Sequence, residues 1–147
     1  MAKSSTRLVW SGGGLYLGID SALHSIVVST QDDAHRAAMK PSDLLLLALA
    51  SCTAVDVVSI LAKKRQPLTS MEIVAEGEQE AEPPWAFRSI HLTFHLRGDR
   101  LTLEAARRAV ELAEGKYCSV AASLRPQVRI TTEVEILEEP EVRSGKA

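Results

Sequence analysis

The sequence is poor in aromatic residues and in cysteine. Aromatic residues make up 4% of its 147 residues, and the only cysteines are Cys52 and Cys118. Two cysteines are too few for a disulfide-stapled scaffold. Because aromatic residues are scarce, the core must be built from Leu, Val, Ile and Ala. Neither sign of charge dominates, because 17 Lys and Arg stand against 19 Asp and Glu. This balance gives no electrostatic reason to expect nucleic acid or an anionic membrane as a partner.

Residues 1–10 lack the apolar stretch of a secretory signal peptide, so we expect a cytoplasmic protein in a reducing compartment. A length of 147 residues is typical of one domain, and such a domain buries roughly 70% of its unfolded surface. We divide this single domain, residues 1–147, by its sequence pattern. The parts are N-terminal strands and a connection (1–40), a central helix (41–66), strands and a second helix (70–138) and a polar tail (139–147).

The predicted central helix begins at Pro41, a residue suited to the first helical position, and has basic residues at 63–65 near its C-terminus. Residues 44–55 form a charge-free run of 12 residues, shorter than the roughly 20 that a membrane span needs. We therefore predict a core helix that is apolar on nearly every side. One small subunit offers too little surface to cover such a helix, so the pattern also predicts a homodimer.

Alternation of apolar and polar residues predicts strands in the rest of the chain. Residues 7–30 are typical of two or three strands of a meander, and residues 71–78, 90–97 and 128–136 alternate clearly. The segment between the last two predicts an amphipathic helix whose apolar stripe is Leu103, Ala106, Val110, Ala113 and Tyr117. This order of elements predicts an α+β fold with a mostly antiparallel sheet.

The four histidines do not form a metal-binding pattern. His91 and His95 lie four residues apart on one predicted strand, which separates them by roughly 13 Å, too far to share a metal ion. His24 and His35 stand alone, and the cysteines lack the close spacing of a zinc site. The G-x-S-x-G motif of serine hydrolases is also absent. We therefore expect solvated histidines and no metal.

Cys52 allows two interpretations from its sequence context alone. Most cysteines inside an apolar helix are buried and inert. Against this, Ser51 and Thr53 interrupt the apolar run, and Asp56 shares the helix face of Cys52 because it lies four residues further on. Cys118 begins another possible helix, where amide donors can lower the pKa of a thiol. These residues therefore leave an inert pair and a redox pair both open.

Two segments resemble the OsmC/Ohr family of osmotically inducible and organic hydroperoxide resistance proteins. The segment PSDLLLLALASCTAVDVV, at 41–58, is similar to the signature helix of that family. The segment EGKYCSVA, at 114–121, resembles its second cysteine motif, and the predicted order of elements matches along nearly the whole chain. The two cysteines are 66 positions apart, and the likeness is to the general OsmC-like branch.

The resemblance implies an intertwined homodimer with two equivalent sites at its interface. It implies a thiol-dependent peroxidase that reduces organic hydroperoxides in stress defence, with Cys52 as the peroxidatic cysteine and Cys118 as the resolving one. A disulfide would form between them and be reduced by a dithiol or a lipoylated protein. No metal, haem or other cofactor is implied.

Two positions depart from the peroxidase branches of that family. Leu15 stands where those branches have an arginine that polarises the cysteine, and Ser42 stands where they have a glutamate. Asp43 lies one residue after the position of that glutamate, and it points to the opposite helix face from Cys52.

Another cation must therefore activate Cys52 if it is catalytic. Arg36 is our first candidate, followed by Arg7 and Arg125. The alternatives to a peroxidase are a non-catalytic dimer that binds a small apolar ligand or senses thiol stress, and a purely structural protein with two inert cysteines.

Overall fold

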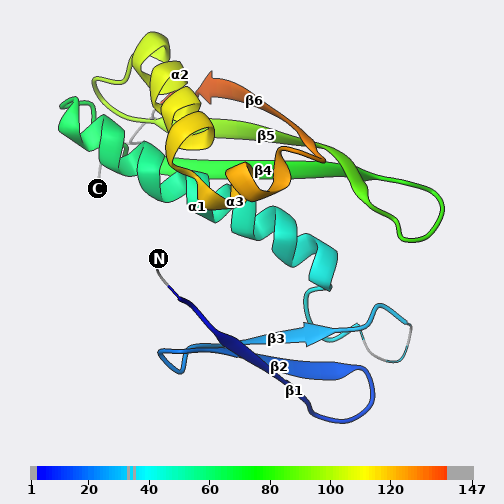
Figure 1. The fold of residues 1–147 in the computed structure, drawn as a ribbon. Helices are drawn as coiled ribbons and strands as arrows, with labels where there is room; N and C mark the ends of the chain where they lie inside the picture. The colour runs from blue at the N-terminus through cyan, green and yellow to red at the C-terminus, as the bar shows by residue number, and fades with distance from the viewer. Residues whose placement is uncertain (1–2, 33, 35, 139–147) are drawn as a thin grey trace, which may run out of the picture. The chain divides into compact units, whose positions relative to one another are not determined.

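The computed structural model describes residues 3–32, 34 and 36–138, and within them the chain is a mixed α+β protein with two three-stranded sheets and three α-helices (Figure 1). The predicted α+β class is confirmed. The chain divides into two compact units, Met1–Leu45 and Leu46–Ala147, which are described separately. The predicted polar tail, 139–147, and His35 lie outside the described residues.

The first unit contains a three-stranded antiparallel sheet. Its strands β1 (Thr6–Trp10), β2 (Leu15–Asp20) and β3 (Ser25–Ser29) pair in chain order, which confirms the predicted meander. The β1–β2 turn contains Gly12 and Gly13 with φ angles of 96° and 54°. These angles lie in the left-handed region that glycine adopts without steric cost, so this glycine run is a tight turn.

Helix α1 (Pro41–Lys63) begins as predicted, but this chain buries only one stripe of it. The stripe consists of Leu49, Ala50, Thr53, Val57 and Leu61. Val55 is 71% exposed, and Leu47 and Val58 are exposed as well. The prediction of a helix covered on nearly every side is therefore not met within one chain, because the second sheet and α2 supply cover on one face only.

By length and composition, α1 is also able to cross a membrane: it has 23 residues, and a stretch of 18 of them has a mean hydropathy of 2.3. The estimate from the charge-free run of 12 residues was therefore too strict. The same test is passed by the core helix of a soluble protein, so this finding alone is weak evidence for a membrane span.

The second unit is built on strands β4 (Ser70–Gln79), β5 (Phe87–Arg97) and β6 (Arg129–Ile136), in that order across the sheet. Strands β4 and β5 are antiparallel, whereas β6 runs parallel to β5. The strands thus form two sheets, in which three of the four pairings are antiparallel, as predicted, and the β5–β6 pairing is parallel. The reason is the connection from β5 to β6, which contains helices and so returns the chain to the same end of the sheet.

One face of this sheet forms the core and the other is polar. The inward side chains of β5 are all fully buried: Ile90, Leu92, Phe94 and Leu96. On the outer face, His95 Nδ1 lies 3.6 Å from Glu72 Oε2 and His95 Nε2 lies 3.2 Å from Glu135 Oε2. A histidine of β5 thus lies beside glutamates of both neighbouring strands, an arrangement that favours strand pairing.

The helical connection agrees with the prediction in part: the possible helix that begins at Cys118 is present, but the amphipathic helix predicted over 103–117 is interrupted after Leu112. Helix α2 (Leu103–Leu112) is capped by Thr102, whose side chain accepts from the Ala105 N–H. A π-helical turn, η1 (Ala113–Tyr117), follows, and then a short helix, α3 (Ser119–Leu124). Because a π turn pairs residues five apart, the buried stripe continues from Ala113 to Cys118. Cys118 is accordingly 2% exposed, whereas Tyr117, which we expected on the stripe, is 52% exposed.

Candidate functional site

The two cysteines meet in the second unit. Cys52 lies midway along α1 and is half-buried, and Cys118 is the N-cap residue of α3 and is buried. Both are free thiols, and each side chain shifts the pKa of the other. Cys52 packs against the core cluster to which Cys118 belongs. The fold therefore brings together two residues that are 66 positions apart in the sequence.

The environment of Cys52 favours its thiolate. Burial raises the pKa of the Cys52 thiol, but hydrogen bonds outweigh this effect and leave the pKa below the ordinary thiol value. The strongest of them comes from the Cys118 side chain. The Val120 N–H and the hydroxyl and N–H of Ser119 also lower the pKa. Donors that stabilise the charged sulfur have this effect in general.

The environment of Cys118 favours its neutral thiol. Burial raises the pKa of the Cys118 thiol to about 11, and the hydrogen bond with Cys52 adds to the rise. The Ala121 N–H donates to Cys118 Sγ at 3.2 Å and acts in the opposite direction. The pair is therefore asymmetric: Cys52 is the stronger candidate for a nucleophile at neutral pH, and Cys118 is a proton-bearing neighbour.

We expect the pKa of Cys118 to make folding stability depend on pH. The folded state holds this proton up to a pH of about 11, while an unfolded chain releases it near the ordinary thiol pKa. The free energy of unfolding should therefore fall as pH rises from about 9 through about 11, since the unfolded state then binds fewer protons. Urea titrations of wild type and Cys118→Ala across this range measure the effect. Equal slopes in the two proteins would contradict it.

Two other predicted site residues lie in the first unit. Arg36 is exposed, and its Nε donates to the Gln31 carbonyl oxygen at 3.0 Å. Asp43, also exposed, lies 3.5 Å from the ammonium group of Lys40. Their roles toward Cys52 stay predictions, because Cys52 belongs to the second unit.

Asp56 lies in the second unit, one helical turn beyond Cys52. It lines a cavity of about 410 Å³ together with Ser59, Ile60, Lys63, Lys64 and Tyr117. Tyr117 is the residue before Cys118, so this cavity adjoins the segment that carries the second cysteine. Neither cysteine lines this cavity, and a role of Asp56 toward Cys52 stays a prediction.

The sequence interpretation missed the groups that lower the pKa of Cys52. We looked for a cation, whereas the groups that lower it belong to a thiol, a hydroxyl and two amides of residues 118–120. A signal was available in Ser119, a polar residue directly after Cys118 at a possible helix start. The two amides carry no such signal, because every non-proline residue has one.

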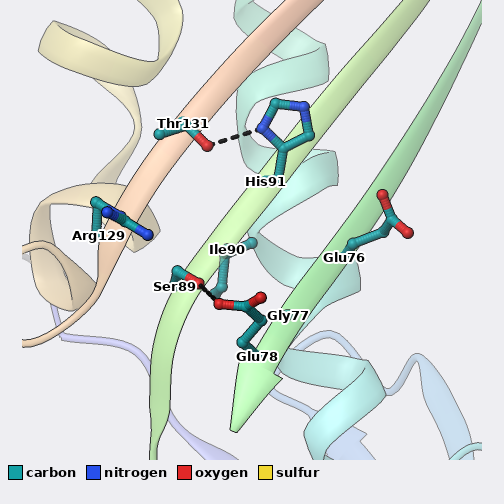
Figure 2. Close-up of a pocket in the computed structure, with 8 residues that line it drawn as sticks. All are labelled: Glu76, Gly77, Glu78, Ser89, Ile90, His91, Arg129 and Thr131. Atoms are coloured by element: carbon teal, nitrogen blue, oxygen red, sulfur yellow. Dashed lines mark hydrogen bonds between the residues drawn. The ribbon is translucent and has the colours of Figure 1, made fainter.

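A second cavity, of about 440 Å³, lies on the outer face of the second sheet (Figure 2). Ser89 Oγ donates to Glu78 Oε2 at 2.7 Å, and His91 Nδ1 lies 2.7 Å from Thr131 Oγ1. Neither cysteine lines this cavity. Its polar groups are largely paired with each other, which is typical of a solvated sheet surface.

Across residues 3–32, 34 and 36–138, no group of three or more His, Cys, Asp or Glu side chains is arranged to hold a metal ion. His24, one of the histidines considered above, pairs with Asp20 at 3.0 Å. His91 and His95 are bound to neighbours on the adjacent strands.

Known proteins share the sequence pattern of this chain. The sequence pattern of the family described as "OsmC-like protein" matches residues 31–133. Protein YhfA of Escherichia coli K12 is 37% identical over 131 residues, which cover 89% of this chain and 96% of that protein.

Solved structures share the fold. An OsmC-like protein from Mycoplasma pneumoniae has a TM-score of 0.81 at 15% identity, covering 93% of this chain and 99% of that one. The organic hydroperoxide resistance protein OhrB of Bacillus subtilis has a TM-score of 0.63 at 14% identity, covering 91% and 98%. At these identities the likeness concerns the fold alone.

Proposed function

Because the chain belongs to the OsmC-like family, we propose that it is a thiol-dependent peroxidase that reduces organic hydroperoxides in stress defence. The asymmetric thiol pair is the observation that carries this proposal. Cys52 has a pKa below the ordinary thiol value and Cys118 has one of about 11, and each thiol contributes to the shift of the other. A peroxidase that uses two cysteines needs one ionised nucleophile and one thiol held in reserve beside it.

In the first step, the Cys52 thiolate attacks the terminal oxygen of the hydroperoxide. The O–O bond breaks, an S–O bond forms, and the alkoxide leaves as an alcohol after taking a proton. Cys52 is oxidised to a sulfenic acid and the peroxide is reduced. Hydrogen bonds from the 118–120 segment favour the thiolate that starts this step.

In the second step, Cys118 attacks the sulfenic sulfur of Cys52. A disulfide forms, and the hydroxyl group leaves as water with the proton that Cys118 releases. An external dithiol then reduces the disulfide and is itself oxidised, which returns both thiols. The cycle converts one hydroperoxide and one dithiol into an alcohol, water and the oxidised dithiol. It needs no metal or organic cofactor.

The direct test is peroxide consumption. Reduced protein should consume cumene hydroperoxide catalytically with dithiothreitol or dihydrolipoamide as reductant. A rate no higher than that of the reductant alone would contradict the peroxidase. It would favour a non-catalytic dimer that binds a small apolar ligand or senses thiol stress. Leu15 and Ser42, which replace the arginine and glutamate of the peroxidase branches, are the observations that favour this alternative.

We also propose a homodimer. The exposed apolar side chains of α1, Leu47, Val55 and Val58, support it because a partner chain would remove them from water. We expect analytical ultracentrifugation at micromolar concentration to give twice the 16.0 kDa chain mass. A stable monomer at that concentration would contradict this proposal without touching the chemistry of the thiols.

A further inference from the structure

The π-helical turn before Cys118 changes which residue faces the core. In an α-helix the Cys118 N–H would pair with the Glu114 carbonyl, four residues earlier. Here it donates instead to the Ala113 carbonyl at 2.8 Å, five residues earlier. Tyr117 is half exposed as a result, and Cys118 takes the inward position.

The carbonyl group that the π turn releases has another donor. Arg125 Nη2 donates to the Glu114 carbonyl oxygen at 3.1 Å. The same nitrogen also contacts the Glu114 carboxylate, through Oε1. One guanidinium therefore satisfies the displaced backbone acceptor and neutralises the side chain of the same residue, and such charge-assisted bonds are the strong ones.

Arg125 is also fixed to the helix that Cys118 begins. The backbone N–H of Arg125 donates to the Ala121 carbonyl oxygen at 2.9 Å, at the C-terminal end of α3. Cys118 is the N-cap residue at the other end of the same helix. The Glu114 side chain is only 17% exposed, so this pair is better shielded than an ordinary surface ion pair. The contact thus joins the two ends of the segment 114–125 that carries the second cysteine.

We propose that the Glu114–Arg125 ion pair holds the chain in the π-helical register that turns Cys118, and not Tyr117, toward Cys52. Arg125 is then a positioning residue that acts through Cys118. Its importance for catalysis rests on the proposed function, whereas its effect on the cysteines does not. A π turn is rare inside helices, so we expect this register to depend on local contacts of this kind.

Loss of the pair should allow the α-helical register, with opposite effects on the two cysteines. Tyr117 would return to the apolar stripe and Cys118 would move toward water, where its pKa falls toward the ordinary value near 8.5. Cys52 would lose the thiol donor that favours its charged form. Cys118 should therefore become more reactive and Cys52 less reactive near neutral pH.

The test is iodoacetamide alkylation of Arg125→Met, with each cysteine followed separately by peptide mass spectrometry at pH 7.5. We expect Cys118 to react at least about tenfold faster than in wild type and Cys52 about three- to tenfold more slowly, in line with the change in thiolate fraction. General loosening of the fold would accelerate the alkylation of both cysteines. A faster rate at Cys118 together with a slower rate at Cys52 is therefore specific to a change of register.

Three further variants complete the design. Arg108→Met breaks a solvent-exposed Arg–Glu pair, Arg108 with Glu111 at 3.3 Å on α2, and should leave both rates unchanged. Arg125→Lys should restore part of the wild-type pattern. If circular dichroism shows that Arg125→Met is unfolded, Glu114→Gln is assayed for the same opposite changes.

Folded protein in which both rates match wild type, or both rise, would overturn the proposal. Failure of the proposed peroxidase is a separate result, because alkylation requires no turnover. A protein without peroxidase activity that still shows the opposite rate changes would keep the register role of Arg125 and remove only its catalytic meaning.

Discussion

We expect Cys52→Ser to lower the catalytic consumption of cumene hydroperoxide by on the order of a thousandfold or more, as removal of a nucleophile does in other enzymes. A serine hydroxyl does not ionise in the environment that favours the Cys52 thiolate. The measurement is steady-state turnover with dithiothreitol, corrected for the reductant alone. Retention of more than a tenth of the wild-type rate would contradict the role of Cys52.

Two variants control for this substitution. Ser51→Ala changes the preceding residue, which is exposed and donates to the Ala48 carbonyl at 3.2 Å, and should leave turnover unchanged. Cys118→Ser should still consume one equivalent of peroxide, because Cys52 is intact. That variant should accumulate a sulfenic acid, which dimedone traps, and should over-oxidise with excess peroxide. The pair of controls separates a role in attack from a role in resolution.

We expect Phe94→Ala to lower the free energy of unfolding by about 3–5 kcal/mol. Phe94 is fully buried in β5, between fully buried Leu92 and Leu96, so its removal leaves a cavity inside the core cluster. Urea denaturation followed by circular dichroism gives the value. Because β5 carries the core against which α1 and α2 pack, this change should also loosen the cysteine pair.

Val74→Ala provides the matched control for that prediction. Val74 lies on β4, is 40% exposed, and in the sheet register is paired with Thr93, the residue before Phe94. It loses a smaller side chain on the outer face, so we expect about 1 kcal/mol or less. A cost for Phe94→Ala no greater than that for Val74→Ala would show that the sheet does not support the core in the way described.

The sequence predicted secondary structure well where apolar residues follow a clear pattern. The alternation over 90–97 predicted β5, because a strand with one buried face alternates apolar and polar residues. The charge-free run after Pro41 predicted the presence of α1 but not which of its faces is buried. The parallel pairing of β6 with β5 was missed although it was accessible, since a helix in the connection favours a parallel crossover. The interpretation of the sequence used the order of the elements and did not ask which direction the helical connection gives the last strand.

The arrangement around the thiols was only partly accessible. The signature segments singled out Cys52 and Cys118, and the structure brings their side chains together. The π turn was not predictable from a helical period of 3.6, because a single extra residue shifts the stripe without changing composition. Tyr117 was therefore assigned to the core in place of Cys118. The contact of Arg125 with Glu114 depends on that turn, so Arg125 was considered only as a possible activating cation.

The most direct test of the account is a stoichiometric reaction of the reduced wild-type protein with cumene hydroperoxide, followed by thiol titration and peptide mapping under non-reducing conditions. We predict that one equivalent of peroxide removes both free thiols of each chain and yields a single cross-linked peptide joining Cys52 to Cys118, with a mass two hydrogens lower. Recovery of both thiols unmodified after excess peroxide would contradict the central claim that these two cysteines form a peroxide-reducing pair.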